Sequence, residues 1–171
     1  MKEKNKLQDL VQIIIPTHNR TNMLKRVLDY YRKTGREFNF TIVDSSNRKN
    51  KLSNRKLISF YPDLKILYLD TFPENLHQHH KFSKMVKYIK SKYCVFCPDD
   101  DFIVPSGIKE CVSFLEKNPD YSAAHGTYIG FHLFKGPLKY KNFWWNFRYK
   151  NQSLLENTSA KRLTSYLRNL N

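Results

Sequence analysis

Residues 11–20 read VQIIIPTHNR, a short apolar run followed by a proline and a polar loop. An apolar run of this length that ends at a proline is typical of a buried strand. Thr21 then stands where the N-cap of a helix is expected, and apolar residues recur at helical spacing until Gly35. The stretch therefore predicts a buried strand over 11–15 that leads through a polar loop into a helix.

The alternation of strand and helix continues along the chain. Further apolar runs predict strands over 40–43, 64–69 and 93–97. Helical spacing predicts a helical turn over 57–60 and helices over 76–90, 106–117 and 158–170. Two later runs, 121–125 and 127–134, predict strands that are antiparallel or lie at a sheet edge. Strands that alternate with helices indicate an α/β fold, with a mostly parallel sheet covered by helices on both faces.

The chain is strongly basic, with 171 residues and a net charge of +15. Residues 131–171 hold eight Lys or Arg and one acid, Glu156, which gives +7. This balance favours anionic partners: phosphorylated ligands, nucleic acid or an acidic lipid surface. A bias in genome composition would also enrich lysine, so the charge alone does not choose among these interpretations.

Several features predict a cytoplasmic protein. No apolar run approaches the roughly 20 residues that span a bilayer. Residues 1–8 are polar and lack the apolar centre of a signal peptide. The three cysteines are too few, and odd in number, for a disulfide framework, which fits a reducing compartment.

Polar clusters follow three of the predicted strands. Residues 16–20 (PTHNR) come after the first, 44–46 (DSS) after the second and 99–101 (DDD) after the fourth. In an open α/β sheet, ligands bind at the carboxyl ends of the strands. No glycine-rich phosphate loop is present, which disfavours a dinucleotide oxidoreductase or a P-loop NTPase.

The aspartate triplet predicts a metal site. Adjacent carboxylates repel one another unless a cation or hydrogen-bond donors offset their charge. A hard divalent ion with oxygen ligands, shared with the diphosphate of a ligand, would provide that charge and act as a Lewis acid. The alternative is a solvated acidic turn between a strand and a helix that begins near a proline.

Three motifs in this order, IIIPTHNR, IVDSS and YCVFCPDDDF, resemble family-2-type glycosyltransferases with a GT-A (Rossmann-like) fold. The segments DDDF, NPDY (118–121) and GTYIGF (126–131) are similar to a bacterial subgroup that assembles surface polysaccharide or glycolipid. The resemblance covers residues 11–131. It implies an inverting transfer of sugar from a nucleotide-diphosphate sugar to an acceptor hydroxyl, with Mn²⁺ or Mg²⁺ as cofactor.

The resemblance also implies roles for individual residues. The base pocket would be lined by Pro16, Thr17, His18, Asn19 and Arg20. Asp44, with Ser45 beside it, would accept a hydrogen bond from the base, although the family commonly has two acids here. Asp99 and Asp100 would bind the ribose, and Asp101, together with Asp99, the metal.

Two lysines of the predicted helix over 76–90 are further candidates for the donor site. Lys81 and Lys84 are three residues apart and would therefore share a face of that helix. By the resemblance, Lys84 falls near the donor diphosphate. The alternative is that Lys84 is an ordinary surface lysine.

The resemblance implies two regions. Residues 1–134 would form the nucleotide-sugar-binding GT-A domain, and residues 135–171 a basic, aromatic segment with a C-terminal helix that begins the acceptor side. The acceptor would be a glycan or a lipid-linked molecule. The family places its catalytic carboxylate well downstream, whereas this chain has only Glu156 after Asp120. This suggests a fragment of a longer enzyme, or alternatively a chain that binds donor without efficient transfer.

Residues 135–150 (KGPLKYKNFWWNFRYK) mix cations with aromatic rings. Such a mixture suits peripheral contact with the inner face of a membrane or a lipid-linked acceptor. It also suits stacking on RNA bases, or plain cover of the sheet or of an acceptor cleft. The alternative function is therefore a basic nucleic-acid-binding module without catalysis, although the resemblance makes nucleic acid the less favoured partner.

Overall fold

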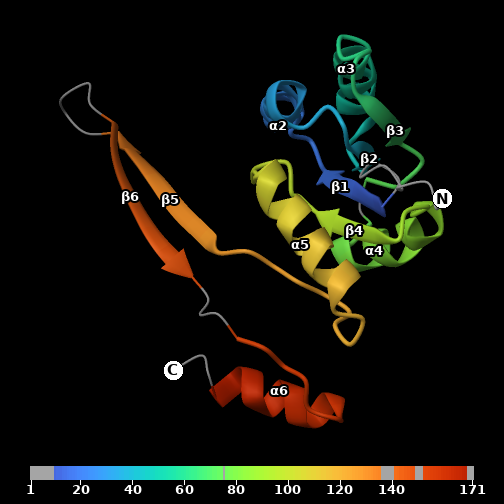
Figure 1. Cartoon of the computed structure of the whole chain (residues 1–171). Coiled ribbons are helices and arrows are strands. Elements are labelled where there is room, and N and C mark those ends of the chain that lie inside the picture. Colours follow the sequence, from blue (N-terminus) through green and yellow to red (C-terminus); the bar gives the residue numbers. More distant parts are fainter. Residues whose placement is uncertain (1–9, 75, 136–140, 149–151, 169–171) are drawn as a thin grey trace. The chain divides into compact units, whose positions relative to one another are not determined.

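The computed structural model describes residues 10–74, 76–135, 141–148 and 152–168, with the backbone alone at 78, 131–135 and 141–148. Residues 1–8, used above to predict localisation, lie outside the described residues. The chain forms two compact units, Met1–Val112 and Ser113–Asn171. Figure 1 shows the elements of both. The boundary expected between residues 134 and 135 falls inside the second unit and stays a prediction.

The first unit is built on a four-stranded parallel sheet in the order β3-β2-β1-β4. Its strands are β1 (Val11–Thr17), β2 (Asn39–Asp44), β3 (Lys65–Leu69) and β4 (Tyr93–Phe96). Its helices are α2 (Thr21–Thr34), α3 (Arg48–Ile58), α4 (Gln78–Met85), the 3₁₀ helix η1 (Val86–Tyr88) and α5 (Pro105–Lys117), which continues into the second unit. The predicted α/β class and parallel sheet are confirmed.

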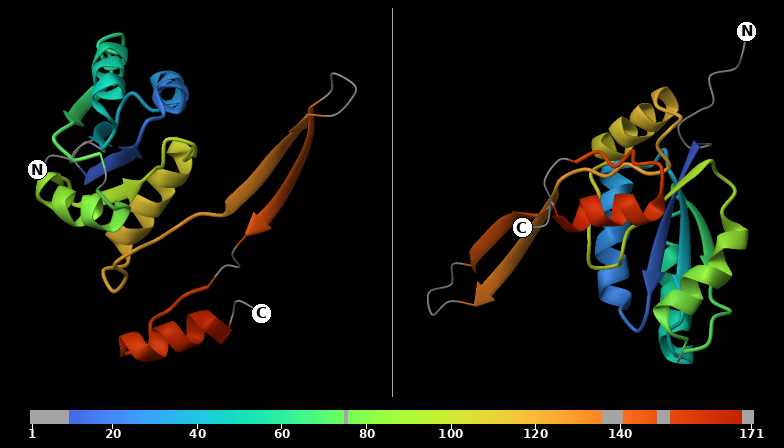
Figure 2. Two further views of the ribbon diagram at one scale, coloured as in Figure 1. Left: turned by 180° about the vertical axis from the view of Figure 1, so that it is seen from behind. Right: turned by 90° about the horizontal axis from the view of Figure 1, so that it is seen from below.

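Helices cover both faces of this sheet. Ile13 and Ile15 of β1 lie in one core cluster, to which α2 contributes Leu28 among others. Ile14 points to the opposite face and lies in a second cluster with Met85 of α4. Alternate residues of a strand face opposite sides of a sheet, and a strand buried on both faces is apolar along most of its length. Figure 2 shows α2 and α4 on the two sides of the sheet.

The second unit holds a separate antiparallel pair of strands, β5 (Tyr128–Lys135) and β6 (Lys141–Arg148), followed by α6 (Ser159–Arg168). Near the start of this unit, the rings of Phe114 and Tyr121 pack edge to face with their centroids 4.9 Å apart. Within the described part of the chain, no helix is both long enough and apolar enough to span a membrane.

Helix α3 is the largest departure from the predicted elements. Only a helical turn over 57–60 was expected, whereas the helix begins nine residues upstream at Arg48. Its start is stabilised by Asn47, whose Oδ1 accepts a hydrogen bond from the Asn50 N–H at 2.9 Å. The sequence RKNKLSNRKLI has few apolar residues at helical spacing, so periodicity revealed only its apolar end.

Other boundaries also differ. The helix expected over 76–90 consists of α4 and η1, since Ile89 adopts an extended conformation. Residues 121–125 form no strand, because the Tyr121 N–H donates to the Asn118 carbonyl in a turn. The N-cap of α2 is Arg20 and not Thr21. Strand β6 was not predicted.

Candidate functional site

A cleft of about 490 Å³ opens at the carboxyl edge of the parallel sheet. The loops after all four strands contribute to its walls, together with one side chain from α4. Its lining residues are Pro16, Thr17, His18, Arg20, Ser45, Glu74, Leu76, Lys81, Pro98, Asp99 and Asp100. The structure thus brings most of the predicted site residues to one edge of the sheet.

Asp99, which follows the edge strand β4, is linked to the end of the neighbouring strand β1 at the floor of the cleft. Its side chain is only 4% exposed and accepts a hydrogen bond from Thr17 Oγ1 at 2.7 Å. Arg20 Nη1 lies 3.3 Å from Asp99 and 2.8 Å from Asp100, so one guanidinium bridges two carboxylates. Burial raises the pKa of Asp99, against the opposing effects of Thr17 and Arg20. The charge of Asp99 therefore needs cationic partners at this position.

Lys81 reaches the same floor from α4. It is only 5% exposed, and its Nζ donates to the Thr17 carbonyl at 3.3 Å. Burial lowers the pKa of Lys81, while Asp44 and Asp99 act in the opposite direction. Lys84 is exposed and does not line the cleft. Of the two lysines that were expected to share a helix face at the donor site, only Lys81 therefore lines the cleft.

The loops after β1 and β2 are tied together by hydrogen bonds. His18 Nδ1 lies 2.9 Å from the Ser45 carbonyl oxygen. Asn19 has a φ of 55°, a left-handed conformation that asparagine tolerates better than most residues. In this conformation its N–H donates to Ser46 Oγ at 2.7 Å, and its Oδ1 accepts from the Asn47 N–H at 2.9 Å. Asn19 thus holds one wall of the cleft in place without lining it.

Asp44 is enclosed beneath this wall. It is fully buried and does not line the cleft. One oxygen accepts from the Ser46 N–H at 2.7 Å, and the other from Asn54 Nδ2 at 2.8 Å and from the Tyr68 hydroxyl at 2.6 Å. Burial, followed by this bond to Asp44, raises the pKa of Tyr68. Direct contact between Asp44 and a base would require this network to open.

Asp101 lies at the edge of the site. Its carboxylate is partly buried, does not line the cleft, and forms no hydrogen bond or ion pair within the described residues. Burial raises the pKa of Asp101, and the neighbouring Asp100 raises it further. A nearby cation would offset both effects.

The described residues contain no group of three or more His, Cys, Asp or Glu side chains arranged for a metal ion. Mg²⁺ and Mn²⁺ are nevertheless held in many sites by one or two carboxylates together with phosphate oxygens and water. Asp99 and Asp101 fit that pattern, because they are two carboxylates close together in sequence, one buried and one without a partner in the described part of the chain.

Glu74 and Leu76 belong to the site but were not predicted. They lie in the loop after β3, where no cluster of polar residues marks the strand end in the sequence. Asn54 and Tyr68, which hold Asp44, were missed for a similar reason, since they come from the middle of α3 and of β3. Sequence spacing does not show which distant side chains converge on a buried carboxylate.

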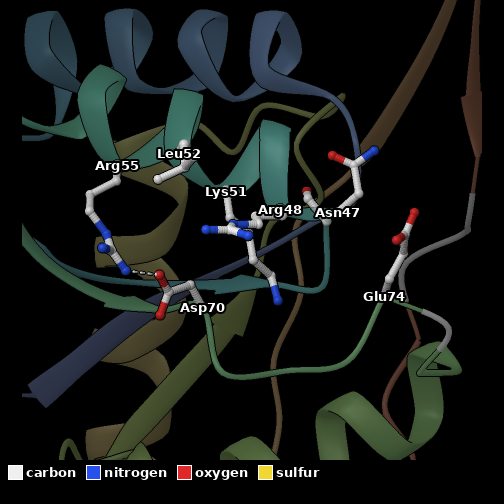
Figure 3. Close-up of a pocket in the computed structure, with 8 residues that line it drawn as sticks. Asn47, Arg48, Lys51, Leu52, Arg55, Asp70 and Glu74 are labelled. Atoms are coloured by element: carbon white, nitrogen blue, oxygen red, sulfur yellow. Dashed lines mark hydrogen bonds and ion pairs between the residues drawn. The ribbon is translucent and has the colours of Figure 1, made fainter.

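A second cavity of about 370 Å³ lies between α3 and the loop after β3. Figure 3 shows its lining residues, with Arg55 paired to Asp70 and with Glu74 facing the Asn47 end of α3. Lys51 Nζ is also engaged, donating to the Phe72 carbonyl at 2.6 Å. Glu74 lines both this cavity and the cleft.

Two solved structures have a similar fold. The mannosyltransferase PcManGT from Pyrobaculum calidifontis, in complex with GDP-Man and Mn²⁺, matches with a TM-score of 0.53 and 19% identity, over 61% of this chain and 32% of that chain. TarS from S. aureus, in complex with UDP-GlcNAc, matches with a TM-score of 0.52 and 16% identity, over 64% of this chain and 32% of that chain. The chain thus spans about a third of the length of either relative.

The likeness to these structures, at such low identity, concerns the fold alone. No curated protein sequence matches the chain at a significant level. The model of the family described as "Glycosyl transferase family 2" matches residues 12–168, which is most of the chain. The protein, with its GT-A fold, therefore belongs to glycosyl transferase family 2.

Proposed function

We propose that this chain forms the donor-binding part of an enzyme that transfers a sugar from a nucleotide-diphosphate sugar to an acceptor hydroxyl, with inversion. The observation that carries the proposal is the floor of the cleft, where Asp99 lies between Thr17 and Arg20, with Lys81 buried close by. Cations and carboxylates beside an open cavity at a strand-end edge are what a bound diphosphate and metal require.

The cations of the cleft would bind the diphosphate. Lys81 is held in place by its hydrogen bond to Thr17, so it presents a fixed positive charge. Arg20 is half-exposed and can turn from its carboxylate partners toward a phosphate. Asp100, once released, would accept hydrogen bonds from the ribose hydroxyls.

Mn²⁺ or Mg²⁺ would be held by Asp99 and Asp101 together with the diphosphate. When bound, the ion supplies Lewis-acid stabilisation of the charge on the leaving diphosphate. Arg20 and Lys81 would orient the diphosphate, while Thr17 and Arg20 favour the charged form of Asp99.

The relatives support this donor class, because one was solved with GDP-Man and Mn²⁺ and the other with UDP-GlcNAc. For the whole protein we propose a glycan or lipid-linked acceptor in polysaccharide or glycolipid synthesis, at the cytoplasmic face of a membrane. Contact with the membrane through 135–150 is part of this proposal, and the side chains of that segment lie outside the described residues.

The direct test is isothermal titration calorimetry of the chain with a panel of nucleotide sugars, with and without Mn²⁺. We expect at least one nucleotide sugar to bind, with affinity that rises when Mn²⁺ is present. Asp101→Ala should remove the effect of Mn²⁺, whereas Asp120→Ala, at an exposed position outside the cleft, should leave it intact. If no nucleotide sugar binds in the presence of the metal, the proposal is wrong.

The net charge of +15 favours one second candidate, a nucleic-acid-binding module. The two functions respond differently to salt, because binding to a nucleic acid releases counterions from many phosphates. RNA affinity that falls steeply with salt and survives Asp101→Ala, in a chain that binds no nucleotide sugar, would favour this second function.

A further inference from the structure

We infer that Glu74, and not Asp44, is the carboxylate that recognises the base of the donor, and that it selects guanine. The inference rests on the proposed function and adds the identity of the nucleotide to it. It follows from three observations on the cleft: which carboxylates are already occupied, which one is open, and where the open one lies.

The other carboxylates that line the cleft, and Asp44 beneath it, already have partners within the fold. Asp44 is fully buried and accepts three hydrogen bonds from within the fold. Asp99 is held by Thr17 and Arg20, and Asp100 is paired with Arg20 and is assigned by the proposed function to the ribose. Opening the network around Asp44 would leave buried donors without partners, which is costly. A base that enters the cleft therefore finds no free oxygen on Asp44 or Asp99 to accept its hydrogen bonds.

Glu74 presents an open carboxylate. Its side chain is exposed, and the one hydrogen bond it has among the described residues comes from Asn19 Nδ2 at the limiting distance of 3.5 Å. A bond of that length is weak and easily replaced by a better donor. An ionised carboxylate only accepts hydrogen bonds, and it has two oxygens with which to do so.

The position of Glu74 separates it from the diphosphate. The cations Arg20 and Lys81 converge on Asp99 and Thr17 at the floor of the cleft. Glu74 is instead linked to Asn19, which contacts the Ser46–Asn47 loop. Figure 3 shows Glu74 facing that loop from the segment after β3. A nucleotide whose diphosphate lies at the cationic end would thus bring its base toward Glu74.

The chemistry of the four bases then decides the selectivity. The hydrogen-bonding edge of guanine carries two adjacent donors, N1–H and the N2 amino group, which match the two oxygens of a carboxylate. Uracil has a single N–H between two carbonyl oxygens, and these would repel the second carboxylate oxygen. Adenine and cytosine each place a ring acceptor beside their amino group. Only guanine can form two parallel hydrogen bonds with Glu74, and bidentate charged pairs are the strong ones.

The test is calorimetry of the full chain with GDP, UDP, ADP and CDP in the presence of Mn²⁺. We expect GDP to bind at least about tenfold more tightly than the other three, because a hydrogen-bonded pair with a charged group is worth about that factor. Glu74→Gln replaces one acceptor by a donor, so GDP affinity should fall about tenfold, while UDP affinity should hold or rise because the new amide N–H can donate to a uracil carbonyl.

The control is Glu110→Gln, which removes the same charge from an exposed position on α5 and should leave the GDP to UDP ratio unchanged. Tight binding of UDP by the unmodified chain would overturn the inference and leave the proposed function standing. So would a Glu74→Gln variant that loses affinity for GDP and UDP equally, since that result indicates a structural role. If none of the four nucleotides binds, the proposed function fails together with the inference.

Discussion

At the scale of single residues, Lys81 lowers the stability of the fold while it serves the proposed donor site. Its ammonium group is buried, and burial is the main cause of its lowered pKa. Burial outweighs the attraction of Asp44 and Asp99, so the charge of Lys81 costs free energy in the folded state. Lys81→Met removes that charge and should therefore raise the free energy of unfolding, measured by urea denaturation. The same variant should bind the nucleotide sugar at least about tenfold more weakly. A variant that is destabilised would show that the bond to Thr17 outweighs the cost of burial.

The pH dependence of stability gives a second measurement on the same residue. The folded-state pKa of Lys81 lies below the ordinary value of 10.5. Well below that folded pKa, lysine is charged in both states and the full cost of burial is present. As the pH rises through the folded pKa toward 10.5, the folded state loses its proton first, and the cost disappears. The stability gained by Lys81→Met should therefore shrink toward alkaline pH. An increase in this difference would contradict the assignment.

Tyr68 tests the network around Asp44. Tyr68→Phe removes the hydroxyl that donates to the buried carboxylate at 2.6 Å. We expect a loss of about 1–3 kcal/mol in the free energy of unfolding, because a buried charged acceptor loses a donor. Tyr166→Phe on α6, outside that network, should change stability by no more than about 0.5 kcal/mol. Equal urea midpoints for the two variants would mean that Asp44 does not depend on Tyr68.

At the scale of elements, Asn19 joins the loop after β1 to the loop after β2. Its φ of 55° strains most side chains, and its amide and N–H bind Asn47 and Ser46. Asn19→Gly removes the side-chain bond but tolerates the conformation, whereas Asn19→Ala adds about 1–2 kcal/mol of backbone strain. Thermal denaturation should therefore rank the stabilities in the order Asn, Gly, Ala. If Ala matches Gly, the left-handed conformation is not required in solution.

The elements differ in how far the sequence could predict them. Strand β1 was predictable because it is buried on both faces of the sheet, and burial on both faces selects the apolar run that marks it in the sequence. Helix α3 was not, because its polar sequence is stabilised at the N-cap by Asn47 and in the interior by Asn54, which binds Asp44. Neither contact produces a pattern of apolar residues at helical spacing that the sequence would show. The strand expected over 121–125 failed because strand formation depends on a pairing partner, which local composition does not specify.

The residues of the candidate site also differ in how far the sequence could predict them. Thr17, His18, Arg20 and Asp99 could be predicted, because residues that directly follow parallel strands must meet at one edge of the sheet. Glu74 could not, since the course of a loop back to that edge depends on contacts and not on strand order. The enclosure of Asp44 was equally hidden. Motif similarity shows that an acid stands at this strand end, but it does not show that the acid is already saturated with donors.

At the scale of the whole molecule, charge and cleft are distributed differently along the chain. The residues that line the cleft lie between Pro16 and Asp100, all within the first unit. Residues 131–171 carry +7 of the net +15. Donor binding and attraction to anionic surfaces should therefore be separable by truncation.

A chain that ends after Ser122 keeps the cleft and removes the basic segment. We expect it to bind the nucleotide sugar within about threefold of the full chain in calorimetry, because it keeps every residue that lines the cleft. Sedimentation with vesicles that contain anionic lipid should show at least a tenfold loss of binding, since each Lys or Arg near such a surface is worth about 1 kcal/mol. Neutral vesicles are the control, and both chains should bind them equally weakly. If the truncated chain folds by circular dichroism but loses the nucleotide sugar, the second unit completes the donor site. If it still binds anionic vesicles as tightly as the full chain, the surface that attracts lipid lies in the first unit, and the membrane role proposed for 135–150 is wrong.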